Sequence, residues 1–233
     1  MSIIGPSYVG AYWGSRRESA ESCGRRLANC MEQLARVDPL LGSWYLRSAS
    51  KRTAMSPVAS DSGSLLGLLA RGVNRRDFGA ATIEELGFSV GLWNRARPAV
   101  GLSATVGAHA SIAGILNSVV LQMPTAADAP ELYAFDSATA IISALVDAWE
   151  PEWTTWTTDS WRNLQPSEPR KPVVGWLTYL RGVESKSLTG IETRGLSAGI
   201  LVCAAEDFER VSEREIRSLR SALEKQALLR PIP

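Results

Sequence analysis

The sequence contains one group of residues whose types match a catalytic site. Glu184, Ser185 and Lys186 form an acid-x-lysine motif, and Asp159 lies upstream as a second acid. In metal-dependent nucleases of the restriction-endonuclease type, such carboxylates hold a divalent cation. The motif is short enough to arise by chance, and the stretch GVESKSLTG predicts a loop where that site needs a strand. A metal-dependent nuclease using Asp159, Glu184 and Lys186 is therefore the alternative hypothesis, not the leading one.

Other catalytic and cofactor signals are weak in this sequence. His109 is the only histidine, so a histidine-based metal site is excluded by count. It lies between small residues and could join a Ser-His-Asp triad only through tertiary contacts. We therefore predict a protein that is not an enzyme and that holds no metal and no cofactor.

The stretch YVGAYWGSRRESAESC, residues 8–23, runs from a predicted strand through glycine and serine into a predicted helix. A helix start of this kind gathers free N–H groups, so Gly14, Ser15 and Arg16 could hold a phosphate. Ser15 and Glu18 have capping-box spacing, however, and their side chains would occupy the same N–H groups. No GxxxxGKS or GxGxxG pattern lies nearby. The stretch therefore predicts the opening of a β-α unit with Ser15 as the helix cap.

Composition limits the partners and the compartment. The 233 residues carry 25 basic and 24 acidic side chains, so the total charge indicates neither a nucleic-acid-binding protein nor an acidic mimic of DNA. The N-terminus lacks the pattern of a secretory signal, and three cysteines, an odd number, fit a reducing compartment. Cys23 and Cys30 are seven residues apart, which places both on one helical face as buried thiols. We predict a cytoplasmic protein.

Residues 98–127 contain no charged side chain, but polar groups interrupt them repeatedly, which disfavours a membrane span. Alternating apolar residues around Val106 and Val119 predict instead two strands of an antiparallel hairpin. Helical periodicity predicts three helices, which begin near Ala20, Ala138 and Ser212. Other strands are predicted at residues 7–13, 43–47, 87–93, 153–157, 173–180 and 196–204, with loops at 48–64 and 159–172.

These elements predict an α+β fold. We expect a single domain over residues 1–233, with a mixed, mostly antiparallel sheet and about three main helices packed on it. A strand, a helix, a proline and an aromatic strand follow one another at about residues 7–47 and again at about 117–157. This order predicts a β-α-β pseudo-repeat.

Eight tryptophans are many for this length. Trp13, Trp93 and Trp176 fit a core, whereas a partly exposed cluster around Trp153 and Trp156, flanked by acidic residues, fits a protein interface. The competing hypothesis is that two of the tryptophans after residue 150 fill the core. The predicted partner-binding residues are Glu150, Glu152, Trp153, Trp156, Asp159 and Trp161.

The N-terminal run YVGAYWGSRRESAESCGRRLANCMEQLARVDPLLGSWYLRS carries a resemblance to a known family. Its strand ends in tyrosine and tryptophan, its helix starts at R-x-E-S, and its W-Y strand follows Asp-Pro. With the later strand GFSVGLWN and the overall length, these features resemble the immunity protein 52 family of bacterial polymorphic toxin systems. The resemblance covers about half of the chain clearly and most of it loosely.

The resemblance implies a cytoplasmic α+β protein encoded beside a toxin of restriction-endonuclease-like fold, often delivered by a type VI secretion system. Such an immunity protein binds the cognate nuclease toxin in the producing cell and blocks its activity, without contacting nucleic acid or membrane itself. The near-neutral charge favours contact specificity, or occlusion of an oligomer interface, over bulk electrostatics. A structural adaptor without antitoxic activity is a further alternative. The sequence makes no prediction about self-association.

Overall fold

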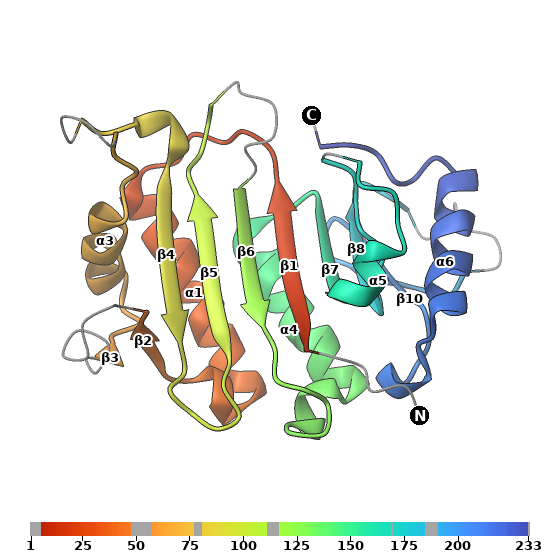
Figure 1. The fold of residues 1–233 in the computed structure, drawn as a ribbon. Helices are drawn as coiled ribbons and strands as arrows, with labels where there is room; N and C mark the ends of the chain where they lie inside the picture. The colour runs from red at the N-terminus through yellow and green to blue at the C-terminus, as the bar shows by residue number, and fades with distance from the viewer. Residues whose placement is uncertain are drawn as a thin grey trace.

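The computed structural model describes residues 6–47, 57–76, 81–110, 117–168, 170–184 and 191–232. Its strands form one ten-stranded sheet in the order β3-β2-β4-β5-β6-β1-β7-β8-β10-β9 (Figure 1). The strands are β1 (Ser7–Trp13), β2 (Trp44–Leu46), β3 (Pro57–Val58), β4 (Phe88–Trp93), β5 (Gly101–Val106), β6 (Asn117–Gln122), β7 (Trp153–Thr158), β8 (Leu177–Arg181), β9 (Thr193–Leu196) and β10 (Gly199–Cys203). The α-helices are α1 (Ala20–Val37), α3 (Ser62–Arg71), α4 (Phe135–Trp149), α5 (Asp159–Asn163) and α6 (Glu213–Lys225). Short 3-10 helices occupy Pro39–Leu41 (η1), Glu84–Leu86 (η2), Pro130–Tyr133 (η3) and Phe208–Arg210 (η5).

The predicted α+β fold with a mostly antiparallel sheet is confirmed, and every strand pairing in the described part of the chain is antiparallel. The described residues contain five α-helices rather than about three. The two additions are α3, which begins inside the predicted loop at 48–64, and the short α5. Helix α3 packs closely against α1 at Gly24. A Cβ on this residue would lie 3.3 Å from Leu66 N in the α3 backbone, so the glycine lets the two helices approach each other. Tertiary packing, not the glycine- and serine-rich sequence, stabilises α3.

Strand β1 lies at the centre of the sheet and pairs with β6 on one side and β7 on the other. Its alternate residues Val9, Ala11 and Trp13 are buried, whereas Tyr8 and Tyr12 are only partly buried. Because side chains alternate between the faces of a strand, β1 divides the molecule into two sides. We call the face that carries Val9 the core face and the face that carries Tyr8 and Tyr12 the open face.

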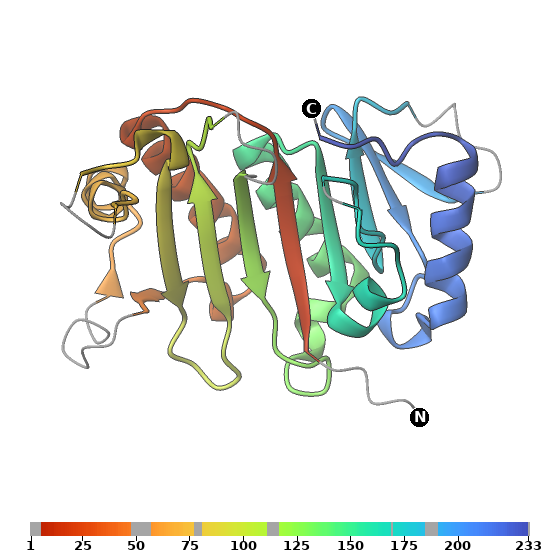
Figure 2. The same ribbon diagram turned by 45° about the horizontal axis from the view of Figure 1, so that its top comes forward.

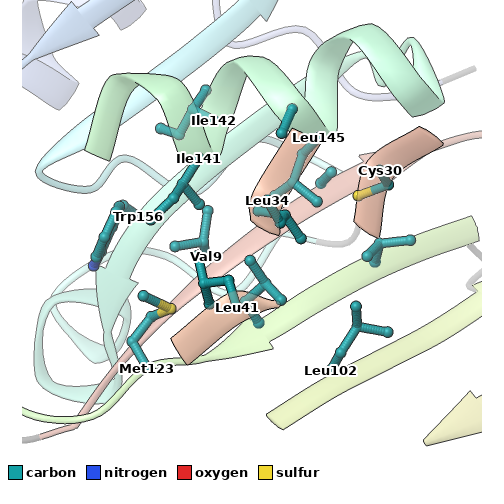
Figure 3. Packing of buried hydrophobic residues seen from close by; sticks show 14 of the residues in the cluster. Val9, Cys30, Leu34, Leu41, Leu102, Met123, Ile141, Ile142, Leu145 and Trp156 are labelled. Carbon is teal, nitrogen blue, oxygen red and sulfur yellow. The ribbon is translucent and has the colours of Figure 1, made fainter. Parts of the chain in front are cut away.

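The main hydrophobic core lies on the core face, under α1 and α4. Figure 1 shows both helices behind β4, β5, β6 and β1, and Figure 3 shows Leu34 of α1 and Ile141 of α4 reaching toward Val9. All three side chains are fully buried. The predicted apolar stripe of α1 is therefore confirmed as the side that packs on the sheet.

A second, smaller core lies on the open face at the C-terminal end of the sheet. Leu219 and Leu223 of α6 pack there with Trp153 of β7, Leu180 of β8 and Ile200 of β10. The predicted capping box of Ser212 and Glu215 starts this helix and is confirmed. In the views of Figures 1 and 2, no described helix covers the open face of β4, β5, β6 and β1. The open face is thus covered at one end only.

The uncharged segment forms the predicted hairpin, because β5 and β6 pair in antiparallel register from Gly101 and Gln122 onward. Asn117 holds its closed end: the side-chain Nδ2 donates to Gly14 O at 2.7 Å, and Oδ1 accepts from Ala108 N at 2.8 Å. None of the described helices combines the length and the apolar composition that a bilayer crossing requires.

The two halves of the predicted pseudo-repeat cross the sheet differently. After α1 the chain enters β2, four positions from β1, whereas after α4 it enters β7, two positions from β6. Strands β6 and β7 flank β1 and both run antiparallel to it. An origin by duplication stays a prediction.

The start of α1 differs from the prediction. The helix begins at Ala20, and its N-cap is Ser19, whose Oγ accepts a hydrogen bond from Ser22 N at 3.1 Å. Glu18 does not form a capping box with Ser15, because its carboxylate is bound by two arginines. The expected β-α unit is present, and its cap lies four residues later than predicted.

The cap assignment predicts which serine stabilises α1. Ser19→Ala should lower the free energy of unfolding by about 1 kcal/mol, because one helix N–H loses its acceptor. The exposed Ser15 is the matched control, and Ser15→Ala should change stability by less than about 0.5 kcal/mol. Urea denaturation of both variants measures the difference. A larger loss for Ser15→Ala would place the cap where the sequence first indicated it.

Burial also sets the chemistry of the thiols. Cys23 and Cys30 are fully buried, as predicted, and burial raises the pKa of each thiol to about 12. Cys203 is partly buried, and burial raises its pKa as well. At pH 8 a thiol reagent should therefore label at most Cys203 in the folded protein and all three cysteines in denaturant.

The same pKa shifts predict a loss of stability in alkali. The ordinary thiol pKa is 9.0, so the unfolded chain releases these protons above pH 9 while the folded chain keeps them until about pH 12. Stability should fall as the pH rises through this window. Cys30→Ala should reduce the slope of stability against pH, and an unchanged slope would contradict the assignment.

Candidate partner-binding surface

The structure buries all three tryptophans of the predicted site. Trp153, Trp156 and Trp161 are 4%, 0% and 4% exposed. Trp156 pairs with Val9 and faces the core, whereas Trp153 pairs with Tyr12 and faces the open side. The expected partly exposed cluster around Trp153 and Trp156 is therefore wrong, because the two side chains point to opposite sides of β7. Their participation in a partner interface stays a prediction.

Trp156 belongs to a buried chain of hydrogen bonds. Its Nε1 donates to Ser7 Oγ at 2.9 Å, and the hydroxyl of Tyr133 donates to Pro124 O. The oxygens of Ser7 and Tyr133 lie 2.6 Å apart. Because Tyr133 has one hydrogen and gives it to Pro124, Ser7 must be the donor in that contact. Each polar atom is thus satisfied, and Trp156 is fixed in the core.

Trp161 lies in the same aromatic core. It is on α5, whose N-cap Thr158 accepts a hydrogen bond from Trp161 N at 3.2 Å. Its ring lies 5.4 Å from that of Phe208, centroid to centroid, and Phe208 also contacts Tyr133 and Trp176. Such tilted and edge-on ring contacts stabilise an aromatic core beyond simple area burial. Trp161 therefore holds α5 against the sheet.

The three predicted carboxylates do not form one acidic patch. Glu150 and Glu152 precede β7, whereas Asp159 follows it. The six residues of β7 lie between the two groups, so Glu152 and Asp159, seven positions apart, are separated by roughly 23 Å along the strand. Glu152 accepts a hydrogen bond from Gly14 N at 3.2 Å, which further commits its charge to the fold.

Glu150 is part of an ion cluster between α1 and α4. It is the left-handed C-cap of α4 and lies 3.2 Å from Arg26 and 3.9 Å from Arg16. The same arginines hold the nearly buried Glu18 at 2.7 and 2.8 Å and donate to Ala148 O and Trp149 O. These arginines neutralise Glu150 and satisfy the end of α4, so the residue does not offer a free negative charge.

The directions of β7 and β8 argue against the nuclease hypothesis. Trp153 pairs with Leu180 and Trp156 with Leu177, so β7 and β8 run in opposite directions. Asp159 directly follows the last residue of β7, while Glu184 comes three residues after the last residue of β8, at the other end of the pair. Two carboxylates a strand length apart cannot bind one metal ion. Lys186 lies outside the described residues, among which no group of three metal-binding side chains occurs.

The open face, in contrast, presents a cavity. Residues 162–168 and 170–173, which run from the end of α5 toward β8, lie over β1 and β7 and enclose about 450 Å³ with them. Tyr12 and Trp153 stack at its base with ring centroids 4.2 Å apart. Sequence reasoning identified only Trp153 among these residues. The alternation of Tyr8, Gly10 and Tyr12 was a usable signal for the other side of the sheet, but nothing in the sequence indicated what covers it.

The sequence profile described as Immunity protein 52 matches residues 6–187, which is most of the chain. The chain belongs to the immunity protein 52 family. The resemblance found in the N-terminal strands and helix is thereby confirmed, and the match also spans β7, the 162–173 segment and β8.

Among solved structures, a Pseudomonas aeruginosa T6SS protein is similar to this immunity protein 52 family member. The superposition has a TM-score of 0.53 with 12% sequence identity, and it covers 96% of this chain and 79% of the other. At that identity the likeness shows the fold alone. No curated protein matches the sequence.

The burial of Trp156 predicts a structural effect of its removal. Trp156→Ala should lower the free energy of unfolding by about 3 to 5 kcal/mol, because it opens a cavity and leaves Ser7 with an unused acceptor. The half-buried Trp93 is the matched control, and Trp93→Ala should cost clearly less. Chemical denaturation followed by circular dichroism measures both. If Trp156→Ala unfolds like the wild type, the core position of this side chain is wrong.

Proposed function

We propose that this chain is an immunity protein that binds and neutralises a cognate nuclease toxin of restriction-endonuclease fold in the cytoplasm of the producing cell. Membership of the immunity protein 52 family carries the proposal. The fold likeness to a T6SS protein supports delivery of the toxin by type VI secretion. The family suggests a protein that acts by binding rather than by catalysis.

The charge distribution supports inhibition by specific contact rather than by imitation of DNA. The net charge is +1, and several acidic side chains are already paired within the fold, among them Glu18 and Glu150. A DNA mimic would need a dense array of unpaired carboxylates facing its partner. Shape complementarity and a few well-placed polar groups therefore have to supply the affinity.

Neutralisation is testable with the cognate toxin, which we expect to be encoded beside this gene. Cells that express the toxin domain should lose viability and degrade DNA, and co-expression of this chain should restore both. Purified together, the two proteins should form a stoichiometric complex, with cleavage suppressed near equimolar amounts. An immunity protein from another toxin pair is the control for specificity. Cells that die equally with and without this chain would contradict the proposal.

The lone chain should have no nuclease activity. With Mg²⁺ or Mn²⁺ it should leave plasmid DNA intact, because Asp159 and Glu184 lie at opposite ends of β7 and β8. Gel analysis of plasmid incubated with the purified protein measures this directly. Metal-dependent cleavage that disappears in Glu184→Ala would establish the nuclease alternative instead.

A further inference from the structure

The cavity on the open face has an aromatic base that glycine makes possible. Tyr12 folds back along its own strand, and a Cβ on Gly10 would lie 2.4 Å from its hydroxyl oxygen. The tyrosine ring therefore lies flat on Gly10 and stacks on Trp153. Tyr8 lines the same cavity from β1. A flat aromatic base of this kind accepts the apolar part of an inserted side chain.

Two buried polar groups at this cavity have no partner. Thr155 is 1% exposed and Trp153 is 4% exposed, and both line the cavity. Thr155 Oγ1 and Trp153 Nε1 make no hydrogen bond. Buried polar atoms are nearly always hydrogen-bonded, since leaving them unpaired is destabilising. Thr154 Oγ1 and Trp13 Nε1 on the core face also lack a partner. Thr155 and Trp153 differ from them because they line the cavity, where an occupant can supply the missing partner.

The rim of the cavity is cationic. Arg162 is exposed and makes no ion pair among the described residues, and Arg170 and Lys171 also line the cavity. The one acidic side chain in the lining, Glu168, is paired with Lys171 and lies 3.6 Å from Arg220. Arg162 is hydrogen-bonded to the Tyr8 side chain. That hydroxyl is uncharged because burial raises the pKa of Tyr8, so the positive charge of Arg162 is not neutralised at the entrance and favours an anionic group.

The wall opposite the sheet is fixed before any partner binds. Gln165 uses its whole amide: Nε2 donates to Trp161 O and Val174 O at 3.0 and 2.7 Å, and Oε1 accepts from Val174 N at 2.9 Å. The buried Arg220 of α6 also donates to Gln165 Oε1 at 2.9 Å. A preformed wall lowers the entropy lost on binding.

We propose that the toxin binds to this chain by inserting a loop that carries a carboxylate into this cavity. The inference rests on the proposed function. The loop carboxylate pairs with Arg162, Thr155 Oγ1 and Trp153 Nε1 gain hydrogen-bond partners, and the apolar part of the loop covers Tyr12. The volume of about 450 Å³ admits a few side chains and no folded element.

Two neighbouring threonines on opposite faces of β7 provide a matched pair of substitutions. Thr155 and Thr154 are both buried and both lack a hydrogen-bond partner, but Thr155 lies on the open face and Thr154 pairs with Ala11 on the core face. Valine has nearly the shape of threonine without the hydroxyl, so neither Thr155→Val nor Thr154→Val should lower the melting temperature. Thr155→Val should weaken toxin binding roughly 3- to 10-fold, and Thr154→Val should leave it unchanged.

Two charge-reversal substitutions, one in the cavity and one outside it, form the second pair. Arg162→Glu should weaken the complex at least about 30-fold, because a like charge replaces the partner of the carboxylate. The control is Arg217→Glu on α6, which is also exposed and lies outside the cavity lining. Calorimetric titration with a catalytically inactive form of the neighbouring toxin measures all four variants, and light scattering measures self-association.

The outcomes separate the inference from the proposed function. Weakening confined to Thr155→Val and Arg162→Glu supports the cavity as the site. Wild-type binding by both variants, with an intact complex, overturns the cavity alone. Variants that alter self-association without altering toxin affinity also overturn it, because the occupant is then a second copy of the chain. A wild-type chain that does not bind the toxin overturns the proposed function and this inference together.

Discussion

The hydrogen bonding of β1 to both β6 and β7 is the constraint on which the rest of the structure depends. Because this strand is paired on both edges, its register fixes which residues face each side. Val9, Ala11 and Trp13 then close the main core against α1 and α4. The open face of β1 then carries Tyr8, Gly10 and Tyr12. A slip of one residue would exchange the two sets, so the core and the cavity are specified together.

Buried polar atoms on the two faces of β7 lie in different surroundings. On the core face Trp156, Ser7 and Tyr133 satisfy one another in a closed chain of donors and acceptors. Thr154 on the core face and Thr155 and Trp153 on the open face are just as buried but unpaired. Of these three, Thr155 and Trp153 line the cavity. A folded domain tolerates few such groups, so those beside a cavity are reasonably assigned to a partner.

The charged groups of this nearly neutral chain have different roles. Arg16 and Arg26 bind Glu18 and Glu150 and join the start of α1 to the end of α4. Arg220 pairs with Glu224 at 2.8 Å and braces the wall of the cavity through Gln165. Arg162 takes no part in these pairs. Several charged side chains thus stabilise the fold, and a local cationic rim can exist in a chain with almost no net charge.

The sequence by itself determined the elements whose signals are local: the span of β1, the uncharged hairpin, the apolar stripe of α1, the cap of α6 and the family. Local periodicity cannot say which strands are neighbours or what covers them. Only the tertiary structure showed that both Trp153 and Trp156 are buried and that α3 packs against Gly24. It also paired Glu18 with two arginines rather than with a helix cap. The reason is physical: burial, ion pairing and cavity formation depend on contacts between residues far apart in the chain, and these are fixed only when the register of the sheet is fixed.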